Sequence, residues 1–368
     1  MKKLLMVLAA CLCAEESTIP VVDMRDFYCE ETRAQFVETV KNALHDYGFF
    51  AVTHTGIDQE VIDRAFARAA EFFALDHDVK MQYEGSRVSF QRGYTFIGKE
   101  KGKGSKVADL KEFLHIGRER EGILPNIWPK EVNVEEDMMH YVRHLENYMV
   151  EMQHVLALTL GEEESFFDSG MEKGDCLLRV IHYPQTKHAS DKRAVWASEH
   201  TDIDLFTILP KATEEGLEVQ LPNGEWLPVS VKGDAFIING GDFLEIFSNG
   251  YLRSARHRVM APRGNSDVER YSMVFFAHPT SETKLYPLSQ WSQDGEKYAH
   301  ANRIEMLMER LADLNLASEE MLKALAESGV MERLVAVRRA SPDAMRALKA
   351  RGLASDVVLE YLNSLEQQ

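Results

Sequence analysis

The chain has 368 residues, of which 45% are hydrophobic and 27% are charged. This composition is typical of a globular protein with one large domain or two smaller ones, and the chain is long enough to bury a core without disulfides. The formal net charge of -17 disfavours nucleic acid and anionic membrane surfaces as partners.

The first 17 residues are expected to lie outside the fold, as a signal-like or disordered leader. The segment MKKLLMVLAACLCA has a basic start and an apolar run up to Cys11, which is similar to a secretion or lipoprotein signal. The run is too short to span a bilayer, and a strand is predicted directly after it. The four cysteines form no CxxC pair, which favours free thiols in a reducing compartment. We therefore expect a cytoplasmic protein without membrane contact; export or lipid anchoring is the alternative.

Residues 18–175 predict a mostly helical N-terminal region that also contains two short strands. The strands are IPVVDM (19–24) and FFAVTH (49–54), and the helices are 30–48, 58–75 and 133–161. Asp58 is expected to cap the second helix. The segment 83–106 is rich in Gly, Lys and Ser and predicts a loop.

The pattern changes at Cys176, where short apolar runs separated by turn signals begin and continue to residue 279. One of the turns is PNGEW, which has Asn-Gly at the centre of a predicted hairpin. Many short strands with close turns predict a β-sandwich or barrel, and a double-sheet jelly roll is one of these folds. Helical patterns return after residue 290.

A metal site would explain the polar residues in SEHTDIDLF (198–206). His200 and Asp202 are two residues apart, so on a strand their side chains would project from the same face. The best third ligand is His257 in SARHRVMAP. Two histidines and one carboxylate are the ligand set of non-haem iron oxygenases, whereas zinc more often takes a closed tetrahedral set. A His-x-Asp pair alone also arises by chance, and most lone strand histidines serve only packing.

A second polar cluster lies in ERYSMVFFAHP, where Arg270 and Ser272 share one face of a predicted strand. A guanidinium inside an apolar barrel needs an anion, and a small carboxylate held by both arms of the guanidinium would supply it. Tyr183 in RVIHYP could add a third contact. The alternative is a structural salt bridge with one of the many acidic residues.

These motifs together resemble the isopenicillin-N-synthase-like branch of the iron(II)/2-oxoglutarate-dependent dioxygenases. The similarity extends from residue 18 to residue 316. Other segments that match in the family's order are YGFFAVTHTGI (47–57), RGYTFIG (92–98), DLKEFLHIG (109–117) and NIWP (126–129). The resemblance implies a mainly β fold: a jelly roll (double-stranded β-helix) catalytic core in 176–280, wrapped by the N-terminal helices and followed by a family helix in 281–316.

The resemblance also implies the roles of the two polar clusters. His200, Asp202 and His257 would hold Fe(II). Arg270 and Ser272 would hold the distal carboxylate of 2-oxoglutarate, and Tyr183 would be a further contact to this cosubstrate. Ile181 stands where the family often has asparagine, so one polar contact near the iron is missing or replaced.

The implied activity is oxidation of a C–H bond in a small-molecule substrate by O2, with release of succinate and CO2. The outcome could be hydroxylation, desaturation or ring closure. One alternative is an iron oxidase of the same fold that needs no 2-oxoglutarate and binds its substrate carboxylate at Arg270 and Ser272. A non-catalytic binding module is the other.

The substrate pocket is expected between the loop 89–100, residues near Phe206 and Phe243, and the C-terminal helices. The aromatic candidates for its walls are Tyr94, Phe96 and Phe206, for which plain core packing is the alternative. Arg92 is a candidate for holding a substrate carboxylate, or else a surface arginine.

Residues 317–368 lie beyond the resemblance and predict an extra helical extension. Ser318, Ser341 and Ser355 fit helix N-caps. The apolar faces of such helices need a partner. We expect them to dock either on the main body or on a second subunit, which would give a homodimer.

Overall fold

The computed structural model describes residues 17–100, 107–189, 195–262 and 267–367. The predicted leader, except its last residue, lies outside these ranges.

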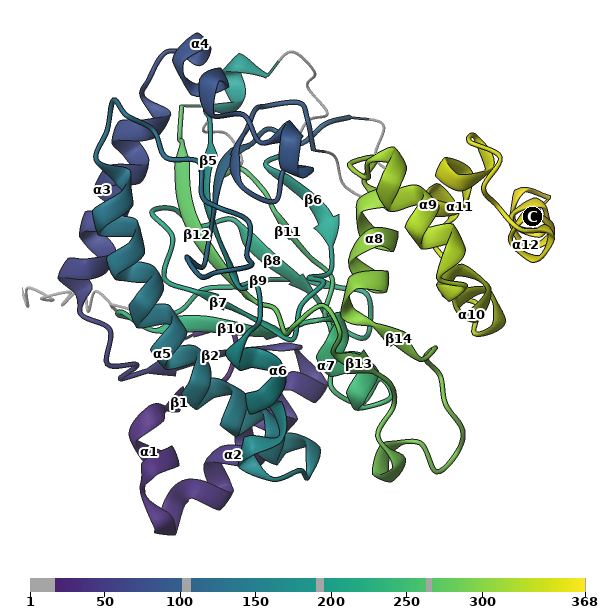
Figure 1. Cartoon of the computed structure of the whole chain (residues 1–368). Helices are drawn as coiled ribbons and strands as arrows, with labels where there is room; N and C mark the ends of the chain where they lie inside the picture. The colour runs from purple at the N-terminus through teal and green to yellow at the C-terminus, as the bar shows by residue number, and fades with distance from the viewer. Residues whose placement is uncertain (1–16, 101–106, 190–194, 263–266, 368) are drawn as a thin grey trace, which may run out of the picture.

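Two β-sheets form the centre of the molecule (Figure 1). The larger sheet has eight strands in the order β1-β2-β10-β7-β12-β5-β4-β3, and the smaller has four in the order β6-β11-β8-β9. The strands of the larger sheet are β1 (Val21–Asp23), β2 (Phe49–Thr53), β3 (Gly93–Thr95), β4 (Glu112–Gly117), β5 (Leu177–Tyr183), β7 (Phe206–Leu209), β10 (Phe236–Gly240) and β12 (Arg270–Ala277). Those of the smaller sheet are β6 (Ala197–His200), β8 (Leu217–Gln220), β9 (Trp226–Pro228) and β11 (His257–Val259). The predicted jelly-roll core with flanking helices is confirmed.

Alternation along β5 shows how the larger sheet separates two cores. Leu178 and Val180 point to the helical side, where they join the large apolar cluster. Ile181 and Tyr183 point to the smaller sheet and join the cluster between the sheets. This two-residue period places polar side chains of the same strand either inside the sandwich or outside it.

Three long helices cover the outer face of the larger sheet (Figure 1). They are α2 (Glu30–Asp46), α3 (Gln59–Phe73) and α5 (Val134–Leu160). Asp58 occupies the N-cap of α3, but its side chain makes no capping hydrogen bond. Shorter helices are α1 (Met24–Tyr28), α4 (His77–Lys80), α6 (Asp168–Glu172) and α7 (Asp242–Phe247). Among the described residues, no helix combines the length and apolarity needed to cross a membrane.

The N-terminal region contributes more to the sheet than its sequence predicts. Besides the two predicted strands it supplies β3 and β4, which form one edge of the larger sheet. The predicted loop 83–106 contains β3. With three residues, this strand is too short to give a recognisable period-two pattern.

The C-terminal helices form a cluster beside the sandwich (Figure 1). They are α8 (Arg303–Asp313), α9 (Glu319–Glu327), α10 (Val330–Ala336), α11 (Pro342–Lys349) and α12 (Asp356–Glu366); two short strands, β13 (Lys284–Leu285) and β14 (Ala301–Asn302), precede them. Ser318 and Ser341 cap α9 and α11 by accepting backbone N–H groups, while Ser355 occupies the N-cap of α12 without such a bond. The extension docks on α8 of its own chain, so its apolar faces give no support to a homodimer.

Candidate metal centre and adjoining cavities

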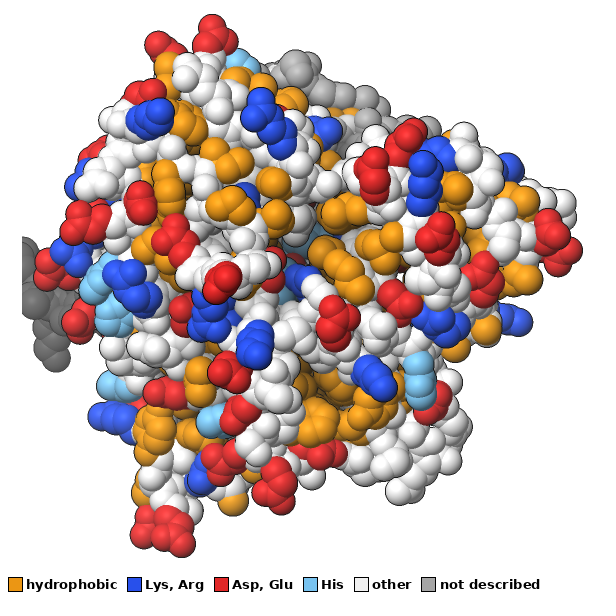
Figure 2. Space-filling model, in the orientation of Figure 1, with side chains coloured by type: hydrophobic (Ala, Val, Ile, Leu, Met, Phe, Trp, Pro, Cys, Tyr) orange, Lys and Arg blue, Asp and Glu red, His pale blue; other side chains and the backbone are white. Residues whose placement is uncertain are grey.

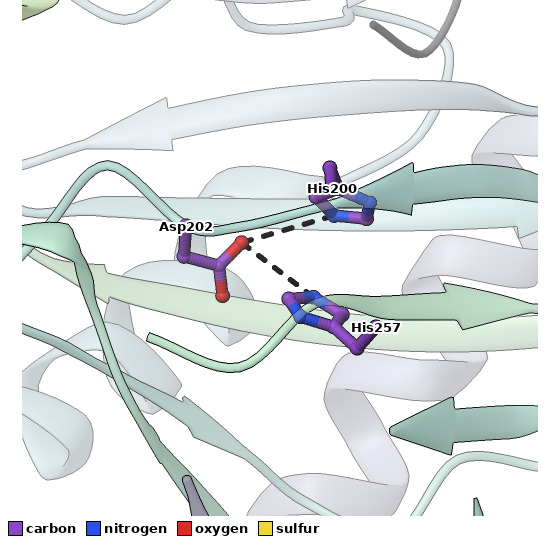
Figure 3. Close-up of side chains that lie close together, drawn as sticks. All are labelled: His200, Asp202 and His257. Carbon is purple, nitrogen blue, oxygen red and sulfur yellow. Dashed lines mark ion pairs between the residues drawn. The ribbon is translucent and has the colours of Figure 1, made fainter. Parts of the chain in front are cut away.

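His200, Asp202 and His257 come together at one end of the smaller sheet (Figure 3). His200 ends β6 and His257 begins β11, and the two residues are paired directly in register. Asp202 lies just beyond β6, and its Oδ1 is 3.8 Å from His200 Nε2 and 3.6 Å from His257 Nε2. One ligand atom from each residue fits within 4.8 Å of the others.

Hydrogen bonds orient all three side chains toward a common point. The Nδ1 atoms of His200 and His257 donate to the backbone carbonyls of Ser198 (2.8 Å) and Ala255 (3.1 Å), which leaves each Nε2 with its lone pair free. Asp202 Oδ2 accepts from Thr207 Oγ1 at 2.7 Å and from Asn239 Nδ2 at 2.9 Å, so Oδ1 faces the histidines. Such outer contacts set the orientation of metal ligands.

Thr207 and Asn239 were not predicted from the sequence. Asn239 carried a usable signal, because it is a lone amide at the end of the apolar run AFIING. A buried amide needs partners, and here its partner is the central carboxylate.

The local environment keeps His200 and Asp202 in the protonation states that bind a metal. Burial, helped by the nearby His257, lowers the pKa of His200 to about 4. Burial alone would raise the pKa of Asp202, but the two histidines and the donors on Oδ2 outweigh it and lower that pKa to about 2. A neutral imidazole and an ionised carboxylate suit ferrous iron as ligands.

Arg270 and Ser272 line a second, smaller cavity of about 140 Å³. Arg270 begins β12 opposite Tyr183, and its guanidinium lies 5.0 Å from the centre of that ring. Its Nε donates to the Glu214 carbonyl at 2.9 Å, but Nη1 is buried and has no hydrogen-bond partner in the described part of the chain. A buried cation with an unused donor fits a carboxylate ligand.

A larger cavity of about 350 Å³ adjoins His200 and Asp202. Its aromatic lining consists of Phe90, Phe113 and Phe276. On the surface, hydrophobic side chains gather over α8 at the edge of a hollow (Figure 2). The size and mostly apolar lining are those of a small-molecule site.

The side chains predicted to form the walls of this cavity lie elsewhere. Tyr94, Phe206 and Phe243 are buried in the core between sheet and helices, and Phe96 packs against the same core. Arg92 is neither a cavity residue nor a surface residue: its side chain is 1% exposed and donates to Asp175 at 2.5 Å. The segment 89–100 nevertheless lines the cavity through Phe90, Gln91 and Glu100, and α8 lines it as well, as expected. Aromatic character in the sequence could not separate core side chains from cavity side chains.

Comparisons with known proteins agree with this geometry. The family "non-haem dioxygenase in morphine synthesis N-terminal" matches residues 19–131, and the "2OG-Fe(II) oxygenase superfamily" matches residues 174–279. A 2-oxoglutarate-Fe(II) type oxidoreductase of Emericella nidulans is 31% identical over 329 residues, which cover 84% of this chain and 93% of that protein. The chain belongs to the 2-oxoglutarate-Fe(II) oxygenase superfamily.

Solved structures of similar proteins share the fold. A full-length protein of Neurospora crassa in complex with alpha-KG matches with a TM-score of 0.72 at 26% identity, covering 81% of this chain and 99% of that one. A 2OG-Fe(II) oxygenase family protein of Caulobacter crescentus matches with a TM-score of 0.71 at 32% identity, covering 80% and 98%. The protein is therefore a non-haem oxygenase that uses Fe(II), 2-oxoglutarate and O2, rather than a cosubstrate-independent oxidase or a binding module.

In this oxygenase one sheet face connects the two cavities. Arg270 and Ser272 stand opposite Tyr183 and Ile181, and further along the same strands Arg179 and Phe276 line the larger cavity. Successive residues on one strand face are about 7 Å apart. The β5–β12 pair therefore extends from the Arg270 guanidinium to the space beside the candidate metal ligands.

Proposed function

We propose that His200, Asp202 and His257 hold the iron of this oxygenase and that the larger cavity beside them receives a small-molecule substrate. The carrying observation is that three metal-ligand atoms lie mutually within 4.8 Å beside a cavity of about 350 Å³. Two of the three side chains, His200 and Asp202, belong to that lining. A substrate C–H bond in the cavity would thus lie next to the metal.

Arg270, Ser272 and Tyr183 are the residues we propose for the distal carboxylate of 2-oxoglutarate. Support comes from the unused Nη1 of Arg270, from the burial of all three side chains and from their place at the far end of the shared sheet face. A guanidinium can bind a carboxylate through two parallel hydrogen bonds. Ile181 leaves the span between this site and the larger cavity apolar.

The proposed reaction inserts one oxygen atom of O2 into a substrate C–H bond and transfers the other to 2-oxoglutarate, which becomes succinate and CO2. Bound iron supplies the activation of O2. The chain's own residues hold the three ligands in fixed positions, bind the cosubstrate, and exclude bulk water with Phe113 and Phe276. Hydroxylation is the simplest outcome of this geometry; desaturation and ring closure need the same ligands.

Relatives with known ligands differ in what they bind. One structure of the Neurospora crassa protein contains thymine, and a JOX2 structure contains Fe, 2OG and JA. The family therefore does not fix the substrate.

We also propose a cytoplasmic location, supported by the free thiols of Cys29 and Cys176.

Iron titration of the purified protein tests the ligand assignment. His257→Ala and Asp202→Ala should lose high-affinity Fe(II) binding and all turnover. His300→Ala is the matched control, because His300 is 60% exposed and pairs with Glu296 on the surface. A His257→Ala protein that kept wild-type iron affinity and succinate release would disprove the assignment.

A further inference from the structure

The larger cavity has two chemically different walls. One wall is polar and comes from β4, β5 and the segment before β4, with Glu100, Asp109, Lys111, His115 and Arg179. A second wall comes from α8 and the turn after it. Its apolar part consists of four leucines, Leu307, Leu311, Leu314 and Leu316, and its charged members are Arg310, which is paired with Asp242, and Asp313. A ligand that fills this space must therefore have a polar edge and an apolar body.

The charges of the polar wall cancel one another. Lys111 Nζ lies 2.8 Å from Glu100 Oε2 and 2.9 Å from Asp109 Oδ2. Arg179 Nη1 lies 3.4 Å from the same Glu100 oxygen. Burial, followed by the charge of Arg179, lowers the pKa of His115 well below its ordinary value, so this imidazole is neutral. Two cations thus face two anions, and the wall needs no ionic ligand. Arg179 is already paired with an anion, whereas Arg270 is buried with an unused donor that fits a carboxylate ligand.

Arg179 nevertheless keeps one donor for a ligand. Its Nε donates to His115 Nε2 at 2.7 Å, and His115 Nδ1 donates to the Phe90 carbonyl at 2.7 Å, which fixes the imidazole tautomer. The guanidinium lies over the Phe113 ring at 4.2 Å. Nη2 has no partner among the described residues, and the side chain remains 19% exposed on the cavity lining. This arrangement holds an N–H donor in place without an acceptor.

We propose that the substrate is an uncharged carbonyl compound, such as an amide, ester or ketone, whose oxygen accepts a hydrogen bond from Arg179 Nη2 and whose apolar body packs on the leucines of α8. This proposal rests on the larger cavity being the substrate site. A carboxylate in the same place would lie beside Glu100, and like-charge repulsion would oppose it. Arg179 would select the substrate by its carbonyl oxygen, and α8 would select it by shape.

Matched compound pairs test the proposal. Small ring compounds would each be offered as the primary amide and as the carboxylic acid, at a pH where the acid is ionised. Binding to the protein loaded with Mn(II) and 2-oxoglutarate would be measured by calorimetry without O2, and succinate release would be measured separately with Fe(II). We expect the amides that bind to do so at least tenfold more tightly than their acids.

Variants of Arg179 complete the test. Arg179→Met keeps the packing over Phe113 but removes the donor, and Arg179→Lys keeps the charge beside Glu100. Both should weaken amide binding at least tenfold while the affinity for 2-oxoglutarate stays unchanged. Arg258→Met is the control, because Arg258 pairs with Glu218 and lines neither cavity.

The outcomes separate this proposal from the proposed function. Tighter binding of acids than amides, or amide binding that is unchanged in both Arg179 variants, would overturn the substrate class alone. Failure of the wild-type protein to bind Mn(II) and 2-oxoglutarate would instead contradict the proposed metal and cosubstrate sites.

Discussion

Replacing Arg270 with leucine should greatly weaken 2-oxoglutarate binding without unfolding the protein. Arg270 is 4% exposed, and burial lowers its pKa, which means that the fold disfavours its charge when no anion is present. Its Nη1 has no partner within the described ranges, and the substitution breaks the Nε hydrogen bond to Glu214 and the contact with Tyr183 but removes a buried charge. The ligand-free variant should therefore melt at the same temperature as the wild type or higher.

The size of the effect follows from the hydrogen bonds that are lost. A guanidinium that holds a carboxylate with both arms makes two charge-assisted bonds, each contributing about 1.5–3 kcal/mol. Losing both would cost about 3 kcal/mol or more, which corresponds to at least a hundredfold rise in Kd. Arg270→Lys should recover part of this loss, because an ammonium keeps the charge but not the fork geometry.

Calorimetric titration of 2-oxoglutarate into the Mn(II)-loaded proteins measures this change directly. Arg258→Leu serves as the control, since Arg258 is bonded to Glu218 at 2.7 Å and stacks on Trp226. Binding of 2-oxoglutarate by Arg270→Leu within threefold of the wild type would contradict the proposed role of Arg270. Substrate-dependent O2 consumption with 2-oxoglutarate rigorously removed would refute it as well.

Three other changes have defined outcomes. Thr207→Val removes the hydroxyl that donates to Asp202 at 2.7 Å, so Fe(II) affinity should fall about 10–100-fold; an unchanged titration curve would contradict this. Burial lowers the pKa of His278 from 6.5 to about 3, so the unfolded chain binds a proton that the folded chain does not. Between these pH values the free energy of unfolding should therefore fall by about 1.4 kcal/mol per unit as pH drops. When the free energy of unfolding is measured by urea denaturation at several pH values in this range, its dependence on pH should be weaker for His278→Gln than for the wild type. An equal dependence would contradict the assignment to His278. Truncation after residue 316 exposes the apolar side of α8, so the shortened protein should aggregate or melt at a lower temperature, and a stable, fully active one would show that the extension is dispensable.

His200 and Asp202 could be singled out from the sequence because their spacing places both on one strand face, whereas the choice of the distant His257 gained its weight from the order of motifs shared with the family. A His-x-Asp pair before an apolar run, together with a later histidine, matches the two-histidine, one-carboxylate ligand set of non-haem iron sites. Arg270 could be singled out for a similar reason, as a charge within an apolar strand. Residue type and strand period are properties that the sequence displays directly.

The cavity walls depended on tertiary contacts that no local pattern encodes. Arg92 and Arg179 look alike in the sequence, but one is buried against Asp175 and the other faces the cavity. Tyr94 turns to the helical core and donates to Glu112, whereas Phe113, on the neighbouring strand β4, turns to the cavity. Whether each side chain faces the core or the cavity follows from how β3 and β4 join the edge of the larger sheet, and β3 could not be recognised in the sequence.

The pairing of His200 with His257 has a mechanical consequence. The two residues come from segments far apart in the chain, and they face each other across β6 and β11 with ring centres 4.3 Å apart. A slip of one residue between these strands would turn one imidazole to the opposite side of the sheet. An ion bound by both would act as a cross-link that locks the strands in register. Removing it with a chelator should speed amide hydrogen exchange in β6 and β11 first, while the distant β1 and β2 keep their protection.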